Sequence, residues 1–257
     1  MAADILRVEK LSKSFSGRLV IDNLSFRVAE GELSAIIGPN GAGKTTLFNL
    51  ITGYHVPDSG KIIFNGQNIA GLQPFKTVRL GLARAFQRTN IFPKMTVLEN
   101  VVSACITRQE RNLNFRTPYK KLTQIHQRAY EILDSVGLTA MAQRLSGTLA
   151  HGNQKLLDIA VALALEPRLL LLDEPTAGMS PDERWQTVAL VKDLWERLKV
   201  TMVFIEHDMD IVFGISQKIR VLCYGNLLAE GTPKEISNNL KVIEVYLGEK
   251  PMMDEAC

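Results

Sequence analysis

Short apolar runs separated by turn residues mark strands in the first third of the chain. These runs are Ile5–Leu11, Ile21–Val28, Leu33–Ile37, Lys61–Phe64 and Gln67–Ile69. Asn65-Gly66 lies between the last two, and this dipeptide favours the type I′ turn of a tight hairpin. An antiparallel β element is therefore expected beside Leu33–Ile37, whose unbroken apolar pattern predicts a buried strand.

A helical period replaces the strand pattern after Leu82–Phe86, which is typical of the end of a strand. The helices expected next are Val97–Thr107, Leu122–Val136 (closed by Gly137) and Gln154–Leu165. Strands and helices then alternate again, as Leu169–Leu172, Pro181–Leu198, Met202–Ile205, a hairpin about Tyr224-Gly225-Asn226 and a terminal helix Ile236–Leu247. This order predicts an α/β fold with a mostly parallel sheet, an antiparallel β flank and an inserted α-helical subdomain.

Composition narrows the class of protein. The chain has 257 residues, of which 46% are hydrophobic and 22% charged, as in an ordinary globular domain. Its net charge of +3 is too small to favour nucleic acid as a partner. The most apolar stretch, Leu156–Leu172, is interrupted by charged residues and falls short of a membrane span. The three cysteines follow no spaced motif, which indicates reduced thiols in the cytoplasm.

A phosphate-binding loop follows the strand Leu33–Ile37, because the sequence there fits the pattern G-x-x-x-x-G-K-T. Its residues are Gly38, Pro39, Asn40, Gly41, Ala42, Gly43, Lys44, Thr45 and Thr46. The glycines let successive N–H groups point at phosphate oxygens. Lys44 supplies a charge for the β- and γ-phosphates, and the Thr45 hydroxyl suits Mg2+. A helix from Thr45 to Thr52 would add its N-terminal dipole, so the sequence predicts a nucleoside triphosphate site rather than a chance glycine-rich turn.

Two carboxylates end the buried strand Leu169–Leu172. Asp173 stands where phosphate-loop NTPases place a second Mg2+ partner beside the loop threonine. Glu174 follows it, where a carboxylate can polarise an attacking water. Alone, the pair would fit an acidic cap on a buried strand equally well, but the phosphate loop upstream favours the nucleotide interpretation.

Two further polar residues follow strands. His207 comes after Met202–Ile205, and Gln87 comes after Leu82–Phe86. Ligand sites of parallel sheets gather at the carboxyl ends of the strands, so His207 is expected near the phosphate loop. Gln87 could reach the water or Mg2+, although a glutamine on a loop fits a surface role equally well.

This set of motifs resembles the ATP-binding subunit of an ABC transporter over nearly the whole chain. Gly38–Thr46 matches the Walker A loop and Leu169–Asp173 the Walker B strand. Gln87, Glu174 and His207 match the Q-loop glutamine, the catalytic glutamate and the switch histidine. Phe15 matches the aromatic residue that stacks on adenine. The family signature segment falls on Leu149, Ala150, His151, Gly152 and Asn153, followed by Gln154.

The resemblance implies a division of the chain and a set of roles. Residues 1–87 and 166–250 would form the nucleotide-binding core with its β flank, residues 88–165 the helical subdomain with the signature segment, and residues 251–257 a frayed tail. The implied cofactors are ATP and Mg2+. The implied catalytic residues are Lys44, Gln87, Glu174 and His207, and the implied metal ligands are Thr45, Gln87 and Asp173.

Three residues depart from the family pattern. Ala150 replaces the signature serine, so one hydroxyl contact to the γ-phosphate is missing, while the Gly152 backbone and the following helix N-terminus remain. Ser180 stands in the D-loop where aspartate is usual, so some contacts across a dimer are expected to differ from the family pattern. Phe15 replaces the commoner tyrosine, and stacking survives that change.

A narrower resemblance is to ATPases of branched-chain amino-acid importers. It rests on Leu149–Gly152, Ala177-Gly178-Met179-Ser180-Pro181, Ile205–Met209, the basic insertion Arg108–Lys121 and the ending Val245–Glu249. By charge alone the insertion is a solvated face rather than a binding site. The implied partners are two polytopic permeases, a second ATPase subunit and, indirectly, a periplasmic or extracellular binding protein. The implied place is the cytoplasmic face of the inner (plasma) membrane, as a peripheral subunit.

Three alternatives to the amino-acid importer stay open at this point. The lipopolysaccharide-export ATPase shares several of the features above. A soluble ABC-type ATPase acting on ribosomes or DNA would usually carry two such domains or a coiled coil, and this chain shows no long heptads. A nucleotide-binding regulator without useful catalysis is disfavoured by the intact Lys44, Asp173, Glu174 and His207.

Overall fold

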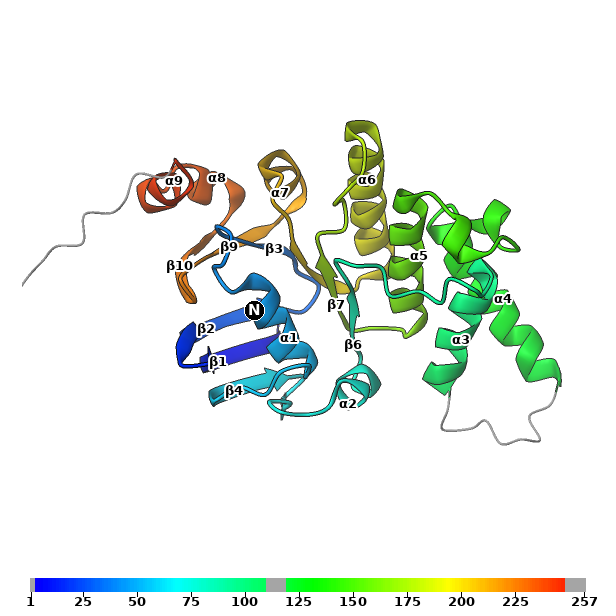
Figure 1. Ribbon diagram of the computed structural model, residues 1–257, viewed down its shortest axis with the longest axis horizontal. Helices are drawn as coiled ribbons and strands as arrows, with labels where there is room; N and C mark the ends of the chain where they lie inside the picture. Colours follow the sequence, from blue (N-terminus) through cyan, green and yellow to red (C-terminus); the bar gives the residue numbers. More distant parts are fainter. Residues whose placement is uncertain (1–2, 110–118, 248–257) are drawn as a thin grey trace, which may run out of the picture. The chain divides into compact units, whose positions relative to one another are not determined.

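The computed structural model describes residues 3–109 and 119–247 of the chain. The chain divides into two compact units (Figure 1). Unit 1 comprises Met1–Gln73 and Ile205–Cys257, and unit 2 comprises Pro74–Phe204. Most of the predicted basic surface segment and the whole of the predicted frayed tail lie outside the described residues.

The predicted antiparallel flank is a four-stranded sheet in unit 1. Its strands, in the order β2-β1-β4-β5, are β2 (Arg18–Ala29), β1 (Asp4–Phe15), β4 (Ser59–Phe64) and β5 (Gln67–Asn68). Asn65 has φ 49° and Gly66 has φ 79°. Positive φ at both central residues is what a type I′ turn requires, so the predicted hairpin turn is confirmed.

The strand that carries the phosphate loop pairs in parallel within unit 1. Each residue of β3 (Leu33–Ile37) is buried, and β3 runs parallel to β9 (Lys218–Cys223), with Ser34 opposite Lys218. β9 in turn pairs antiparallel with β10 (Asn226–Gly231). The helices of this unit are α1 (Lys44–Thr52), α7 (Met209–Ile215), α8 (Pro233–Ser237) and α9 (Leu240–Leu247).

The prediction of one terminal helix over Ile236–Leu247 is wrong. α8 ends where the Asn238 side chain donates to the Lys234 carbonyl at 2.7 Å. α9 begins where the Asn239 side chain accepts from the Lys241 N–H at 3.1 Å. Asparagine side chains compete in this way for backbone groups and so favour helix ends, and two adjacent asparagines break the apolar period.

Unit 2 combines a short parallel sheet with helices. Its strands lie in the order β8 (Thr201–Ile205), β7 (Leu169–Asp173) and β6 (Leu82–Ala85), and β8 ends at the boundary with unit 1. β6 and β7 are parallel, with Leu82 opposite Leu169. The helices are α2 (Pro74–Arg79), α3 (Val97–Gln109), α4 (Tyr119–Ser135), α5 (His151–Ala164) and α6 (Pro181–Leu198). α3, α4 and α5 pack against one another (Figure 1).

The start of α5 corrects a second prediction. The helix begins at His151, three residues before the predicted Gln154, with Ala150 at its N-cap. His151, Gly152 and Asn153 are weak helix formers and lack an apolar period, so the sequence pattern hid the first turn. The signature segment therefore belongs to the start of a helix.

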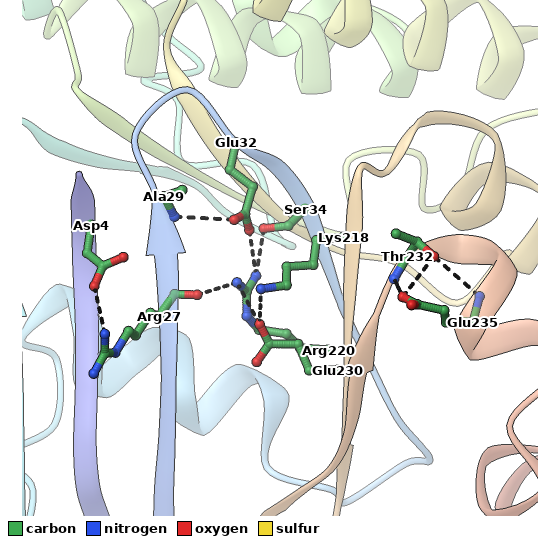
Figure 2. A network of polar contacts seen from close by, with 10 residues as sticks. All are labelled: Asp4, Arg27, Ala29, Glu32, Ser34, Lys218, Arg220, Glu230, Thr232 and Glu235. Atoms are coloured by element: carbon green, nitrogen blue, oxygen red, sulfur yellow. Dashed lines mark hydrogen bonds and ion pairs between the residues drawn. The ribbon is translucent and has the colours of Figure 1, made fainter. Parts of the chain in front are cut away.

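A buried arginine joins four segments of unit 1 beside β3 (Figure 2). Arg220 of β9 is 0% exposed. Its guanidinium donates to Glu32 Oε1 at 2.8 Å, to Ser34 Oγ at 2.9 Å and to the Arg27 carbonyl, and it lies 3.5 Å from Glu230 Oε1. Burying this charge is costly unless it is paired in this way, so the cluster fixes β3 against β2, β9 and β10.

We expect Glu32→Ala to destabilise the protein by about 2–3 kcal/mol, because it removes the nearer of the two carboxylates that pair with the buried Arg220 and leaves Glu230, at 3.5 Å, as the other. The measurement is urea unfolding followed by circular dichroism. Glu196→Ala, at an exposed position of α6, is the control and should change stability by no more than about 0.5 kcal/mol. Equal stability of the two variants would contradict the structural role of the cluster.

Candidate functional site

The phosphate loop of unit 1 has the predicted order of strand, loop and helix. Gly43, at the N-cap of α1, has φ 100°. A Cβ at Gly43 would lie 2.7 Å from Ile21 Cδ1, and a Cβ at Gly38 would lie 2.1 Å from the Leu222 carbonyl oxygen. Both values are too short for real contacts, so any larger residue would push the loop off β2 and β9.

The loop lysine is held inside the curl of its own backbone. Lys44 Nζ donates to the Gly38 carbonyl at 2.7 Å and to the Pro39 carbonyl at 3.1 Å, and the side chain is buried. Thr45 beside it is exposed and Thr46 is half-buried. The first turn of α1 thus presents a cation and an exposed hydroxyl position where phosphate and Mg2+ are bound in phosphate-loop proteins.

Phe15 ends β1 with part of its ring exposed. The ring meets His55 edge to face, with centroids 5.1 Å apart, and Lys13 Nζ lies 5.3 Å from its centroid. Asp58 holds this end of the strand, accepting from Lys13 Nζ at 2.7 Å and from the Ser14 N–H at 2.6 Å. The Lys13 bond, then the Ser14 bond, lowers the pKa of the Asp58 carboxyl. Sequence reasoning missed His55 and Asp58, since no motif links them to Phe15.

His207 lies in unit 1 at the turn between β8 and α7, and it is exposed. The turn is shaped by Asp208, whose carboxylate accepts from the N–H groups of Asp210 at 3.1 Å and Ile211 at 3.5 Å. This is an N-cap, the commonest role of aspartate at the start of a helix. It fixes the backbone on which the imidazole stands.

Asp173 in unit 2 is paired with an arginine that no sequence motif includes. Arg84 Nη2 lies 2.5 Å from Asp173 Oδ2, and the two side chains are 4% and 1% exposed. The Arg84 guanidinium also lies 4.8 Å from the centroid of the Phe86 ring. The sequence did contain a sign of this pair, because an arginine within the short strand Leu82–Ala85 can be buried only if it has a partner.

The second oxygen of Asp173 fits a metal ligand. Oδ1 is buried and, within the described part of the chain, no donor reaches it. A carboxylate oxygen left in this state inside a protein is costly, and carboxylate oxygens are the ligands that Mg2+ prefers. The residue therefore suits the metal role that its position after β7 predicts.

Gln87 and Glu174 lie together in unit 2. Gln87 Nε2 donates to Glu174 Oε2 at 2.8 Å. Glu174 has φ 49°, a left-handed conformation that costs a residue with a side chain about 1–3 kcal/mol and is concentrated at functional sites. The predicted Q-loop glutamine is therefore hydrogen-bonded to the predicted catalytic carboxylate.

The segment Leu149–Asn153 forms the approach and first turn of α5. A Cβ at Gly178 would lie 3.0 Å from the His151 ring, so the turn after β7 packs closely on this segment. Ser180 then caps α6: it accepts from the Glu183 N–H at 3.4 Å, and Glu183 accepts from the Ser180 N–H at 2.9 Å. Serine and aspartate are both good N-caps, which accounts physically for the serine at this D-loop position.

The predicted site residues divide between the two units. Unit 1 contains Phe15, Gly38–Thr46 and His207, whereas unit 2 contains Gln87, Leu149–Asn153, and the pair Asp173 and Glu174. Within each unit the predicted residues lie at the ends of strands or the starts of helices. This is where phosphate-loop proteins carry their chemistry.

The geometry and the sequence agree with one family. The sequence model of the ABC transporter family matches residues 21–177. The chain belongs to this family, and it is one of its ATP-binding cassette ATPases. A second model, described as the branched-chain amino acid ATP-binding cassette transporter, matches residues 226–250 at the C-terminal end.

Individual relatives match over the full length. The chain is 41% identical to the high-affinity branched-chain amino acid transport ATP-binding protein BraF of Pseudomonas aeruginosa, over 97% of this chain and 100% of the relative. It is 39% identical to the corresponding protein LivG of Escherichia coli strain K12, with the same coverage. The solved ADP conformation of the ATP-binding cassette MJ1267 superposes with a TM-score of 0.83 at 31% identity, covering 96% of this chain and 100% of that one.

The predicted family and fold class are confirmed by these comparisons. A nucleotide-free ATP-binding cassette from an ABC transporter also matches, with a TM-score of 0.82 at 32% identity over 96% of this chain and 100% of that one. Among the helices of residues 3–109 and 119–247, none has the length and apolar character needed to cross a membrane.

The Arg84–Asp173 pair should behave as one energetic unit. In a double-mutant cycle of Arg84→Gln and Asp173→Asn, each single change breaks this ion pair and leaves the other charge buried, while the double change removes both charges. We therefore expect a coupling free energy of about 2–3 kcal/mol from the urea unfolding of the four proteins. Additive effects, within about 0.5 kcal/mol, would show that the pair contributes nothing of its own.

Proposed function

We propose that this chain is the ATP-hydrolysing subunit of an ABC importer for branched-chain amino acids or related amino acids and amides. The observation that carries the proposal is the full-length identity of 39–41% to BraF and LivG. The separate match of residues 226–250 to the branched-chain family supports the same cargo class. The wider family alone would leave the cargo open.

The phosphates of ATP would be bound by the phosphate loop. Lys44 and the loop N–H groups hold the β- and γ-phosphates, and Phe15 stacks on adenine through its exposed face. Thr45, Asp173 and Gln87 would hold Mg2+, which would supply positive charge to offset that of the phosphates. The buried Oδ1 of Asp173, which accepts no hydrogen bond in the described part of the chain, supports this assignment.

Hydrolysis would depend on residues that follow β6, β7 and β8. Glu174 polarises the attacking water, and Gln87, bonded to it at 2.8 Å, keeps the carboxylate in place. His207 contacts the γ-phosphate. A water is activated only when the carboxylate is ionised and correctly placed, so the Gln87 contact has a direct effect on turnover.

A second ATPase subunit would complete the site. Leu149, Ala150, His151, Gly152 and Asn153 would face the nucleotide bound by the partner. Gly152 and the start of α5 offer backbone N–H groups and a helix dipole to the γ-phosphate, which does not require a hydroxyl at Ala150. ATP would therefore close the pair of subunits, and hydrolysis would reopen it.

Two permease subunits would bind next to the Q-loop, and the chain would work as a peripheral subunit on the cytoplasmic face of the membrane. We assign residues 88–165 to the helical subdomain that receives them. Phe92 is 60% exposed, while its backbone is held by Asn100, at 2.8 Å and 3.2 Å, and by Ser146 Oγ, at 2.8 Å. A fixed backbone that presents an exposed aromatic ring suits a docking surface.

Affinity purification of the chain from its native membranes tests the proposal. Two polytopic permeases, a second ATPase and a binding protein for branched-chain amino acids should co-purify. Permeases with a periplasmic bridge and no binding protein would instead indicate lipid export. Recovery of ribosomal or DNA-bound proteins alone would overturn the transport role.

Lys44→Ala should weaken ATP binding by about 30-fold or more, since the charge-assisted contact it removes is worth about 2 kcal/mol. Calorimetry of the full chain with ATP measures this. Lys61→Ala, at an exposed position of β4, should bind like the wild type. An unchanged dissociation constant in Lys44→Ala would rule out the phosphate-loop assignment.

Glu174→Gln should lower the rate of ATP hydrolysis by about 100-fold or more, because the amide cannot accept a proton from water. The dissociation constant of ATP, measured by calorimetry, should stay near the wild-type value. Glu196→Gln should match the wild type in both the rate of phosphate release and the dissociation constant. Turnover of Glu174→Gln close to that of the wild type would remove this residue from the mechanism.

A further inference from the structure

Two buried charges on α5 are not among the residues assigned above to nucleotide binding and hydrolysis. Lys155 is 2% exposed and Asp158 is 3% exposed. They lie three residues apart, so they share one face of the helix. Because charged groups are buried only where bonds compensate the lost hydration, their partners show what this face of the helix does.

Lys155 reaches main-chain oxygens on two other segments of unit 2. Its ammonium donates to the Phe86 carbonyl at 3.1 Å and to the Gln87 carbonyl, and it lies 3.4 Å from the Glu174 carbonyl. The last two carbonyls belong to the glutamine and the glutamate whose side chains meet at 2.8 Å. One cation therefore joins the Q-loop, the end of β7 and α5.

Asp158 binds the Q-loop through main-chain N–H groups. Its Oδ2 accepts from the Phe86 N–H at 2.7 Å and its Oδ1 from the Asn90 N–H at 3.2 Å. Burial raises the pKa of this carboxyl to about 6, against the two N–H groups and the charges of Lys155 and Arg84, which lower it. The two N–H bonds hold residues 86–90 at both ends.

We propose that Lys155 and Asp158 act as a backbone clamp that fixes the Q-loop and Glu174 to α5. The inference rests on the proposed function, since it concerns how the hydrolytic residues are positioned. Neither clamp residue is placed in contact with nucleotide, so both are positioning residues. Because α5 begins with the signature segment, the clamp makes that segment, Gln87 and Glu174 shift as one group within unit 2.

The contacts favour this role over simple stabilisation of the fold. Five of the contacts that the pair makes go to main-chain atoms of residues 86–90 and of Glu174. Loosening the clamp should therefore displace Gln87 and Glu174 while the phosphate loop, which belongs to unit 1, keeps its own bonds. The expected result is a fall in kcat with little change in the dissociation constant of ATP.

The test compares Lys155→Met, Lys155→Arg and Asp158→Asn in the full chain, assembled with its permeases and second ATPase subunit, and Lys192→Met at an exposed position of α6 is the control. Three quantities are measured: kcat for ATP hydrolysis, the dissociation constant of ATP, and amide hydrogen exchange of residues 86–90. Lys155→Met and Asp158→Asn should lower kcat by about 10- to 100-fold and speed exchange by about 10-fold or more. ATP affinity should stay within about twofold of the wild type, a free-energy change below about 0.5 kcal/mol, and Lys155→Arg should recover much of kcat.

Several results would overturn the clamp. Exchange and kcat equal to those of Lys192→Met would show that the contacts position nothing. Faster exchange with unchanged kcat would show that they hold the loop without serving hydrolysis. If the wild-type chain shows no turnover even in the complex with its permeases and second ATPase subunit, the proposed function is wrong, and the exchange data alone then decide whether the clamp exists. If Lys155→Met fails to fold, Lys155→Arg and Asp158→Asn carry the same comparison.

Discussion

Main-chain packing around the phosphate loop is the constraint on which unit 1 depends. The Ala42 carbonyl accepts from the Gly225 N–H at 3.1 Å, and the Gly225 carbonyl accepts from the Asp22 N–H at 3.1 Å. A Cβ at Gly225 would lie 2.4 Å from the Val20 carbonyl oxygen. The loop, the turn between β9 and β10, and the start of β2 therefore touch backbone to backbone. This explains why the loop is ordered by protein contacts and presents its N–H groups in a fixed curl.

Buried cations set the geometry around this loop and around the hydrolytic residues. Arg220 fixes β3 within unit 1, Arg84 holds Asp173, and Lys155 holds the backbone of Gln87 and Glu174. A buried cation without its partners is strongly destabilising, so each one tolerates few arrangements of the segments around it. The segments that satisfy these buried cations are therefore held in place, and with them the residues that the ATPase uses.

Local patterns were enough to predict most of the elements and the named motifs. The strand Leu33–Ile37 and the helix Pro181–Leu198 have the predicted bounds, because their apolar periods and turn residues are contained within the segment. The break between α8 and α9 was missed because it depends on two asparagine side chains. Arg84, Lys155 and Asp158 were missed for a different reason: their partners are distant in sequence, so no short motif records them.

The most direct test of the account is transport by the reconstituted complex. The chain, purified with its permeases and second ATPase, is placed in lipid vesicles with the binding protein and radiolabelled leucine, isoleucine or valine. An importer ATPase for branched-chain amino acids should produce vectorial movement of the amino acid that requires both the binding protein and ATP on the side of this chain. ATP hydrolysis that continues without any movement of these amino acids, or that drives a lipid instead, would contradict it.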